Sequence, residues 1–106
     1  MAAAAGPIHL AGVKPPAEGA AIRVVAAGTP VAVFNVGGTL YAIGAVCTHV
    51  GGPLEQGHVA SGVVSCPWHG SKFELANGHV VGGPAQRPVA AFRVRAEGDG
   101  LVLERA

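Results

Sequence analysis

Two short motifs of cysteine and histidine constrain this chain more than any other feature. They are Cys47-x-His49 and Cys66-x-x-His69, separated by residues 50–65, and they use both cysteines and two of the five histidines of the chain. Two thiolates and two imidazoles are enough for one four-ligand metal site. Thiolate sulfur and imidazole suit either zinc or an iron-sulfur cluster, so residue type alone leaves both kinds of metal centre open.

The spacing of the four residues favours one of these two metal centres. A structural zinc site usually takes its first pair of ligands from cysteines with two to four residues between them, whereas here each motif supplies one cysteine and then one histidine. Two mixed pairs fit a two-iron cluster in which one iron binds both thiolates and the other binds both imidazoles. We therefore expect metal ligands at Cys47, His49, Cys66 and His69, and a zinc site of the same residues is the less favoured alternative.

The composition of the chain predicts one small all-β domain. A length of 106 residues leaves room for a single core. Seventeen glycines and eight prolines, with few aromatic residues, indicate short strands joined by many turns. Seven basic residues against six acidic ones give no electrostatic footprint for nucleic acid or for an anionic membrane, so we expect neither as a partner.

The sequence also gives expectations about the location of the protein. The first residues lack the basic and apolar regions of a secretory signal, and no twin-arginine pair occurs. The apolar runs are the size of strands and far too short to span a bilayer, so we expect no membrane anchor. Because both cysteines are assigned to the metal centre, none remains for a disulfide, which is consistent with a cytoplasmic protein.

Strand-like segments alternate with turn residues along the chain. The clearest is a β-hairpin of residues 31–36 and 39–43, because the intervening Gly37-Gly38 permits the positive backbone angles of a tight turn. Further strands are predicted at residues 8–13, 21–26, 62–65, 72–75, 79–81, 89–96 and 101–104, with turns at Asn77-Gly78 and Asp99-Gly100. The ligand pairs therefore fall on loops at strand ends, and no long helical period is present.

The string C-T-H-V-G-G-P-L from residue 47, followed by C-P-W-H-G-S-K-F from residue 66, closely resembles the Rieske [2Fe-2S] signature. The resemblance is dense from about residue 40 to about residue 85 and looser elsewhere. It implies an all-β Rieske fold over residues 1–106, in which an antiparallel base carries an inserted cluster-binding subdomain at about residues 44–83 with two ligand loops. It also implies one [2Fe-2S] cluster per chain.

The resemblance assigns roles to residues that tune the reduction potential. Ser71 matches a family position whose hydroxyl can donate to a bridging sulfide and raise the potential. Phe73 stands where high-potential members have a hydrogen-bonding tyrosine, and Gly52 and Trp68 stand where those members have a disulfide between the loops. The missing tyrosine, disulfide and anchor indicate a lower-potential ferredoxin within the family window of roughly −150 to +300 mV.

Other residues near the ligands are expected to line the cluster or to meet a partner. Gly51 and Gly70 would let the backbone approach the sulfides closely, although both are also ordinary turn residues. Pro84 belongs to a stretch that resembles the loop covering the cluster in this family, with a plain turn as an equal alternative. Trp68 would either pack under the cluster or form part of a docking rim. The nearest charged residues are expected to be solvated surface rather than a steering patch: Glu55, Lys72, Glu74 and Arg87.

The sequence favours an electron carrier over an enzyme. It contains no nucleophile paired with a base and no phosphate loop, and a cluster with four protein ligands leaves no open metal position for a substrate. The resemblance implies transfer of single electrons from a flavin-dependent reductase to the oxygenase component of a Rieske non-haem iron oxygenase that attacks aromatic or related compounds. The alternatives are the small subunit of an assimilatory nitrite reductase, many of which lack the ligands, and a zinc-binding structural module.

Overall fold

The computed structural model describes residues 6–49 and 51–106, and these residues form two antiparallel sheets. The first sheet has the strand order β1-β10-β9-β4-β3-β2. Its strands are β1 Ile8–Leu10, β2 Ala21–Ala26, β3 Thr29–Val36, β4 Thr39–Gly44, β9 Ala91–Glu97 and β10 Gly100–Arg105. The second sheet has the order β5-β6-β7-β8, with β5 His58–Ala60, β6 Val63–Ser65, β7 Lys72–Glu74 and β8 Val80–Gly82. A short 3-10 helix, η1 Leu54–Gln56, precedes β5. The all-β prediction is confirmed.

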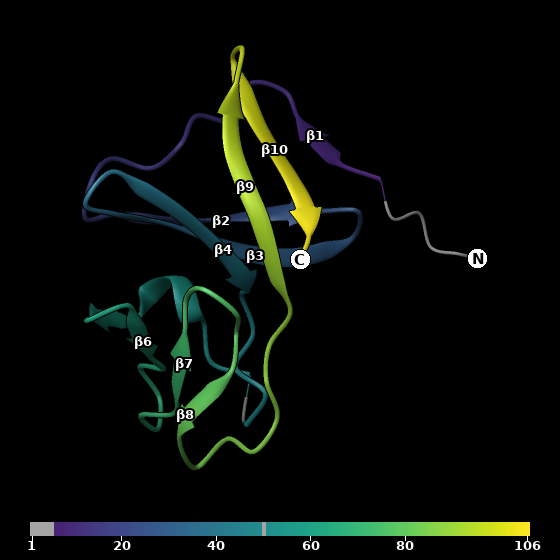
Figure 1. Cartoon of the computed structure of the whole chain (residues 1–106). Helices are drawn as coiled ribbons and strands as arrows, with labels where there is room; N and C mark the ends of the chain where they lie inside the picture. The colour runs from purple at the N-terminus through teal and green to yellow at the C-terminus, as the bar shows by residue number, and fades with distance from the viewer. Residues whose placement is uncertain (1–5, 50) are drawn as a thin grey trace.

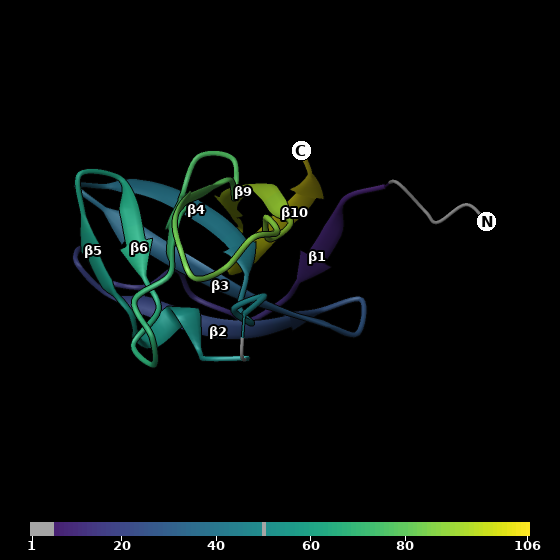
Figure 2. The same ribbon diagram turned by 90° about the horizontal axis from the view of Figure 1, so that it is seen from below.

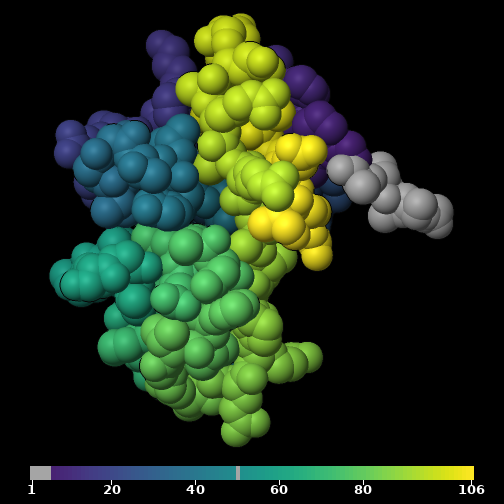
Figure 3. Space-filling model, viewed as in Figure 1, coloured from purple at the N-terminus to yellow at the C-terminus, as the bar shows by residue number. Residues whose placement is uncertain are grey.

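The second sheet is one excursion of the chain between two neighbouring strands of the first sheet. β4 and β9 pair through Ala42 with Phe92 and through Ile43 with Ala91, and all of β5 to β8 lie between them in sequence. Figures 1 and 3 show the second sheet, in green, below the blue and yellow strands of the first. Seen from below in Figure 2, β5 and β6 lie in front of the first sheet. The assignment of about residues 44–83 to a separate cluster-binding subdomain stays a prediction.

The β3–β4 hairpin forms at the predicted glycine pair. Gly37 and Gly38 have φ angles of +62° and +92°, which glycine adopts without the strain that a side chain would bring. Val36 lies opposite Thr39 across this two-residue loop. Most other predicted strands agree with the structure to within two residues at each end.

One strand end differs from the prediction by three residues, and the start of another differs by two. β1 ends at Leu10 rather than at residue 13, because Gly12 has a φ of +77° and the Val13 N–H donates back to the Leu10 carbonyl. β9 begins at Ala91 rather than at residue 89. The reason is that the Val89 N–H donates to a carbonyl in the turn after β7, which ties this residue to the second sheet.

The last turn is shifted by one residue from the predicted pair Asp99-Gly100. Gly100 pairs with Glu97, so the loop between β9 and β10 consists of Gly98 and Asp99. A side chain on Gly100 would overlap the carbonyl of Leu10, so this glycine permits the close approach of β1 rather than the turn. β5 lies outside the predicted strands, and it is a strand through its pairing with β6.

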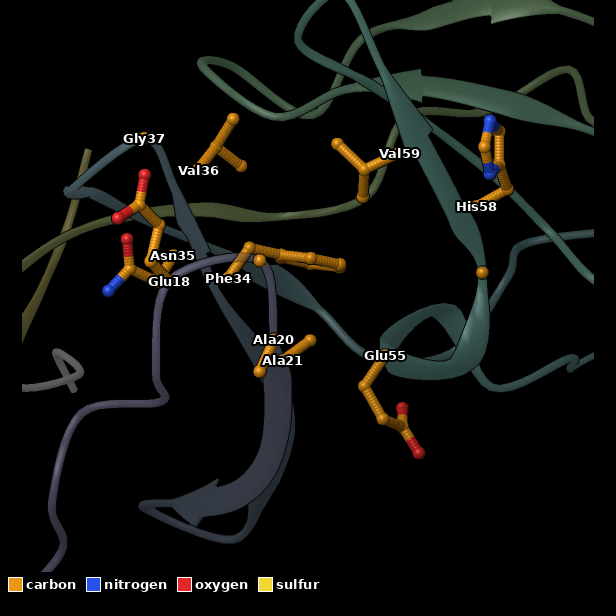
Figure 4. A pocket seen from close by; sticks show the side chains of 12 residues that line it. Glu18, Ala20, Ala21, Phe34, Asn35, Val36, Gly37, Glu55, His58 and Val59 are labelled. Carbon is orange, nitrogen blue, oxygen red and sulfur yellow. The ribbon is translucent and has the colours of Figure 1, made fainter.

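The first sheet buries both of its faces around β3 and β4. One face packs into a core with Leu101 and Leu103 of β10. The opposite face packs onto the second sheet through Phe34 and Ile43, and Figure 4 shows the Phe34 ring extending toward the strand that carries Val59. The second sheet therefore rests on a central part of the first. Among residues 6–49 and 51–106, no helix has the length and apolar character needed to cross a membrane.

Replacing Phe34 by alanine tests this packing. Phe34 is only 2% exposed, and we expect the Phe34→Ala variant to lose about 3–5 kcal/mol of unfolding free energy, because a large cavity opens between the sheets. Val25→Ala is the control, since Val25 is 63% exposed in the same sheet, and it should change stability by less than about 0.5 kcal/mol. Urea unfolding measures both variants, and equal losses would contradict the packing described here.

Candidate metal centre

The first motif lies in a loop that is closed by two backbone hydrogen bonds. The Cys47 N–H donates to the Gly52 carbonyl over 2.9 Å, and the Gly51 N–H donates to the Cys47 carbonyl over 2.9 Å. Just outside this loop, Val46 and Pro53 form an antiparallel bridge. The backbone of Cys47 is thus fixed through both its N–H and its carbonyl before any metal is considered.

The second motif lies in a loop with the same two bonds. The Cys66 N–H donates to the Ser71 carbonyl over 2.7 Å, and the Gly70 N–H donates to the Cys66 carbonyl over 3.0 Å. The partners are again five and four residues after the cysteine. Residues 47–52 and 66–71 are therefore equivalent loops, although histidine follows cysteine by two residues in one and by three in the other.

Gly51 and Gly70 occupy the same position in these two loops. Their φ angles are +82° and +80°, so both loops need a residue that tolerates the left-handed region. Each N–H donates to the carbonyl of its own cysteine, which is the role of a turn glycine. Their predicted approach to the sulfides stays a prediction.

The four candidate ligands separate into a buried pair and an exposed pair. The thiols of Cys47 and Cys66 are free, are each 2% exposed, and belong to the core between the two sheets. The imidazoles of His49 and His69 are exposed, and their ring centroids lie 5.4 Å apart with the ring planes at 82°. Like donors are therefore grouped, with sulfur on the inside and nitrogen at the surface.

The two loops contact each other through a glycine. A Cβ atom built on Gly52 would lie 2.5 Å from Sγ of Cys66 and 3.3 Å from Cγ and Cδ2 of Trp68. The first loop can therefore approach the second only because residue 52 has no side chain. The indole of Trp68 lies against Gly52 and remains 56% exposed, so this contact forms part of the surface.

A third segment, residues 83–88, is tied to both loops by side chains next to the ligands. The Thr48 hydroxyl donates to the Arg87 carbonyl over 2.6 Å. On the other side, the Ala85 N–H donates to Oγ of Ser71 over 3.0 Å, and Ser71 is fully buried. A serine hydroxyl can accept and donate at once, so the Ser71 proton can still serve a further acceptor.

Segment 83–88 also borders a hollow beside one of the histidines. This hollow has a volume of about 390 Å³ and is lined by Thr48, His49, Pro84, Ala85, Gln86 and Arg87. Pro84 is exposed on its wall. A larger hollow of about 450 Å³ lies elsewhere, between β3 and β5, and is bordered by Phe34, Val59 and Glu55 among others (Figure 4). None of the four candidate ligands lines the larger one.

The donor set fits a two-iron cluster. Within residues 6–49 and 51–106, no three side chains of His, Cys, Asp or Glu surround one position as ligands of a single ion would. The grouping of two thiols in the core and two imidazoles at the surface instead provides one sulfur pair and one nitrogen pair. Such a division matches a [2Fe-2S] group with one iron bound by cysteine and the other by histidine.

Comparison with known proteins identifies the family. The family model described as the Rieske [2Fe-2S] domain matches residues 8–93. The chain belongs to this family. Proteins of the Rieske family bind a [2Fe-2S] cluster, in agreement with the cofactor predicted from the two motifs.

Several relatives share this Rieske domain. The ferredoxin component of biphenyl 2,3-dioxygenase from Rhodococcus jostii is 33% identical over 88 residues, which cover 83% of this chain and 82% of that protein. The iron-sulfur subunit of the cytochrome b6-f complex from Chlorobaculum thiosulfatiphilum is 40% identical over 76 residues, which cover 72% of this chain but only 41% of that subunit.

Solved structures agree with the Rieske fold. The ferredoxin of carbazole 1,9a-dioxygenase from Nocardioides aromaticivorans superposes with a TM-score of 0.77 and 28% identity, covering 92% of this chain and 96% of that one. A chain in the complex of reduced oxygenase and oxidised ferredoxin in carbazole 1,9a-dioxygenase gives a TM-score of 0.73 and 29% identity, covering 92% and 90%. The Rieske fold predicted from the motifs is confirmed.

The structure gathers the predicted site residues into one region and adds residues that the sequence analysis missed. The four ligand candidates lie together with the predicted neighbours Ser71, Trp68, Gly51, Gly70 and Pro84. The missed residues are Thr48 and Ala85, which bond segment 83–88 to the two loops. A hydroxyl between two ligands was the available signal for Thr48, whereas a backbone donor such as Ala85 leaves none. Val50 of the signature and residues 1–5 lie outside the described residues.

Replacing Gly52 by alanine tests the contact between the loops. The new Cβ would overlap Sγ of Cys66, so the loops must separate, and we expect iron bound per chain after reconstitution to fall by at least about half, with an unfolding free energy lower by about 1–3 kcal/mol. Gly83→Ala is the matched control, because a Cβ there meets nothing within 4 Å. Full iron binding by Gly52→Ala would contradict the geometry.

Proposed function

We propose that the chain is a one-electron carrier in which Cys47, His49, Cys66 and His69 hold a [2Fe-2S] cluster. The observation that carries the proposal is the separation of the donors into two buried thiols and two exposed imidazoles. When bound, the cluster supplies a centre that can be reduced and oxidised by one electron. The protein itself binds no substrate in this role and is not an enzyme, as its similarity to ferredoxin components supports.

The residues of the chain decide where the electron enters and leaves. The cysteine side faces the core that includes Leu54 and Phe73, both fully buried, which keeps water from the sulfurs. The histidine side faces solvent, so His49 and His69 give the shortest route to a partner. Electron transfer would thus occur at the exposed face, with the region of about residues 44–83 acting as the cluster-binding part.

The ligand types set the range of the reduction potential. The ligands of this site carry two negative charges, one on each thiolate, whereas those of an all-cysteine site carry four. The difference arises because neutral imidazoles replace the other two thiolates. An electron therefore enters a less negative site, and the potential lies above that of plant-type ferredoxins. The Ser71 hydroxyl, held by Ala85, could add a donor toward the sulfide side, whereas Phe73 supplies none.

The partners follow from the relatives. We propose a flavin-dependent reductase as the electron donor and the oxygenase component of a Rieske non-haem iron oxygenase as the acceptor, in the cytoplasm. The support is the similarity to a dioxygenase ferredoxin component and to a structure of oxygenase with ferredoxin. The similarity to a cytochrome b6-f subunit makes a fixed subunit of a larger redox complex the second candidate. Genes for an oxygenase and a flavin reductase beside this one would favour the first candidate.

The cofactor assignment is tested on the purified protein. We expect two irons and two labile sulfides per chain, with the low-average-g EPR signal of mixed cysteine and histidine ligation after reduction. In the His69→Cys variant, if a cluster assembles, the added thiolate charge should lower the midpoint potential markedly. Stoichiometric zinc without sulfide would refute the assignment, and an unchanged potential in His69→Cys would exclude that residue as a ligand.

Two substitutions next to the ligands should move the midpoint potential in opposite directions. Phe73→Tyr adds a hydroxyl that can donate to a thiolate sulfur and should raise the potential, whereas Ser71→Ala removes a donor and should lower it. One hydrogen bond of about 1 kcal/mol corresponds to roughly 40 mV for one electron. Protein-film voltammetry measures both variants. If neither value moves, Ser71 and Phe73 do not contact the cluster, although the four ligands stay unaffected.

A further inference from the structure

Four charged residues lie near the ligand loops in sequence, and the structure separates the two acidic ones from the histidines. The Glu55 carboxylate pairs with Nε of Arg23 on β2 over 3.1 Å. The Glu74 carboxylate, at the far end of β7 from the second loop, accepts from the Asn77 amide over 3.2 Å. Both negative charges are therefore engaged away from the histidine face, which is the exposed surface around His49 and His69.

The first of the two cations, Lys72, is held beside the second loop. Its aliphatic stem packs on Gly82, where an added Cβ would lie 3.2–3.3 Å from Cβ, Cγ and Cδ of Lys72. Its ammonium lies 3.5 Å from the carbonyl of Gly70, the residue after His69. The stem therefore packs on the protein while the ammonium, next to the residue that follows His69, stays exposed to solvent.

The second cation, Arg87, borders the hollow beside the first loop. Its carbonyl accepts from the Thr48 hydroxyl, which fixes its backbone next to His49. Arg87 is exposed, and it lines the hollow of about 390 Å³ together with His49 and Gln86. In the part of the chain that the structure describes, the ion pairs join Arg23 to Glu55 and Arg95 to Glu97, so neither Arg87 nor Lys72 has an acidic partner.

Two large apolar side chains of the second sheet and of its ligand loop are also exposed. Trp68, between two of the candidate ligands, is 56% exposed, and Val81, next to Gly82 of β8, is 50% exposed. Tryptophan and arginine are the residue types that contribute most binding energy at protein interfaces. The histidine face thus combines the unpaired cations Lys72 and Arg87 with the exposed indole of Trp68.

We propose that the histidine face docks a partner protein that presents carboxylates, with one aspartate or glutamate entering the hollow to pair with Arg87 and another lying near Lys72. The guanidinium fork matches a carboxylate in geometry, and charge complementarity selects this occupant. The chain as a whole carries a formal charge of only +1, so the selectivity is local to this face. The proposal rests on the proposed electron-carrier function and names the chemistry of its partner.

Two inorganic oxidants of opposite charge test whether Lys72 and Arg87 make the histidine face electrostatically positive. The reduced holoprotein gives one electron either to ferricyanide, which becomes ferrocyanide, or to tris(phenanthroline)cobalt(III), which becomes the cobalt(II) complex. Stopped-flow mixing at low ionic strength gives both rate constants. Their ratio isolates the charge at the transfer site, because a change in midpoint potential accelerates or slows both oxidants together.

The variants are Arg87→Gln and Lys72→Gln, with Arg95→Gln and Lys14→Gln as controls. Each control removes the same charge from an exposed residue of the first sheet or of the loop before β2. Removing one charge roughly 10 Å from a trivalent ion in water should change each rate about fourfold at low salt, in opposite directions for the two oxidants. The ratio of the ferricyanide rate to the cobalt rate should therefore fall about sixteenfold in the test variants and less than about twofold in the controls.

Competition then distinguishes a protein partner from a small anion. A hexaglutamate peptide should slow the ferricyanide reaction of the unaltered protein, and Arg87→Gln should weaken this inhibition, whereas hexalysine should not inhibit. Equal inhibition by inorganic phosphate at the same charge concentration would show a small-anion site and overturn the docking proposal. Unchanged rate ratios in both test variants, or equal changes in the controls, would overturn it as well.

These experiments distinguish a failure of the docking proposal from a failure of the cofactor assignment. The unaltered protein and every variant are first assayed for iron, sulfide and the EPR signal, so a missing cluster in the unaltered protein refutes the electron-carrier function itself. A normal cluster together with an unchanged rate ratio refutes only the charge-selective docking face.

Discussion

The close approach of the two ligand loops is the constraint on which the rest of this structure depends. Each loop is fixed internally by two hydrogen bonds at its cysteine, and the loops approach each other closely where Gly52 lies against Sγ of Cys66. The pairing of β6 with β7 positions the second loop, and the packing of Leu54 in the core positions the first. The first sheet supplies a rigid support, because β4 and β9 are paired where the excursion begins and ends.

The close approach of the two loops accompanies a difference between the two sides of the site, on which the proposed function depends. Both thiols are turned into a core and both imidazoles toward solvent. A core around the sulfurs excludes water, whereas exposed imidazoles shorten the distance to a partner. Segment 83–88 reinforces the asymmetry, because Thr48 and Ser71 attach it to the two loops from opposite sides. The Thr48 bond holds the backbone of Arg87 beside His49, and both residues line the hollow in which we propose that a partner carboxylate binds.

The sequence was sufficient for features that depend on neighbouring residues. The Gly37-Gly38 hairpin and the two Cys/His motifs are local patterns, and their spacing was enough to predict the turn and to favour a two-iron cluster over zinc. The turn at Gly98 was placed one residue late because Gly100 is required by β1, which is distant in sequence. β5 was missed because its pairing with β6, rather than its own three residues, makes it a strand.

The charged residues near the site also show that contacts between distant parts of the chain cannot be predicted from local sequence. In the sequence, Glu55 and Arg87 are both charges near a ligand loop, and nothing local tells them apart. The partner of Glu55 is 32 residues away, and the bond that fixes Arg87 comes from a residue 39 positions away. Only the folded chain shows that one charge is paired and the other remains free beside a histidine.

The contact between Gly52 and Trp68 suggests how this domain differs from high-potential members of its family. Those members resemble it in the ligand motifs but join the two loops by a disulfide at these positions. Here the indole packs on the glycine, so a non-covalent contact stands in the place of a covalent one. A disulfide restricts the loops even without metal, whereas a packed indole that is largely exposed contributes much less. In this chain a larger share of the order of the two loops must therefore come from the bound cluster, which couples metal binding to the folding of the second sheet more tightly than in a disulfide-linked relative.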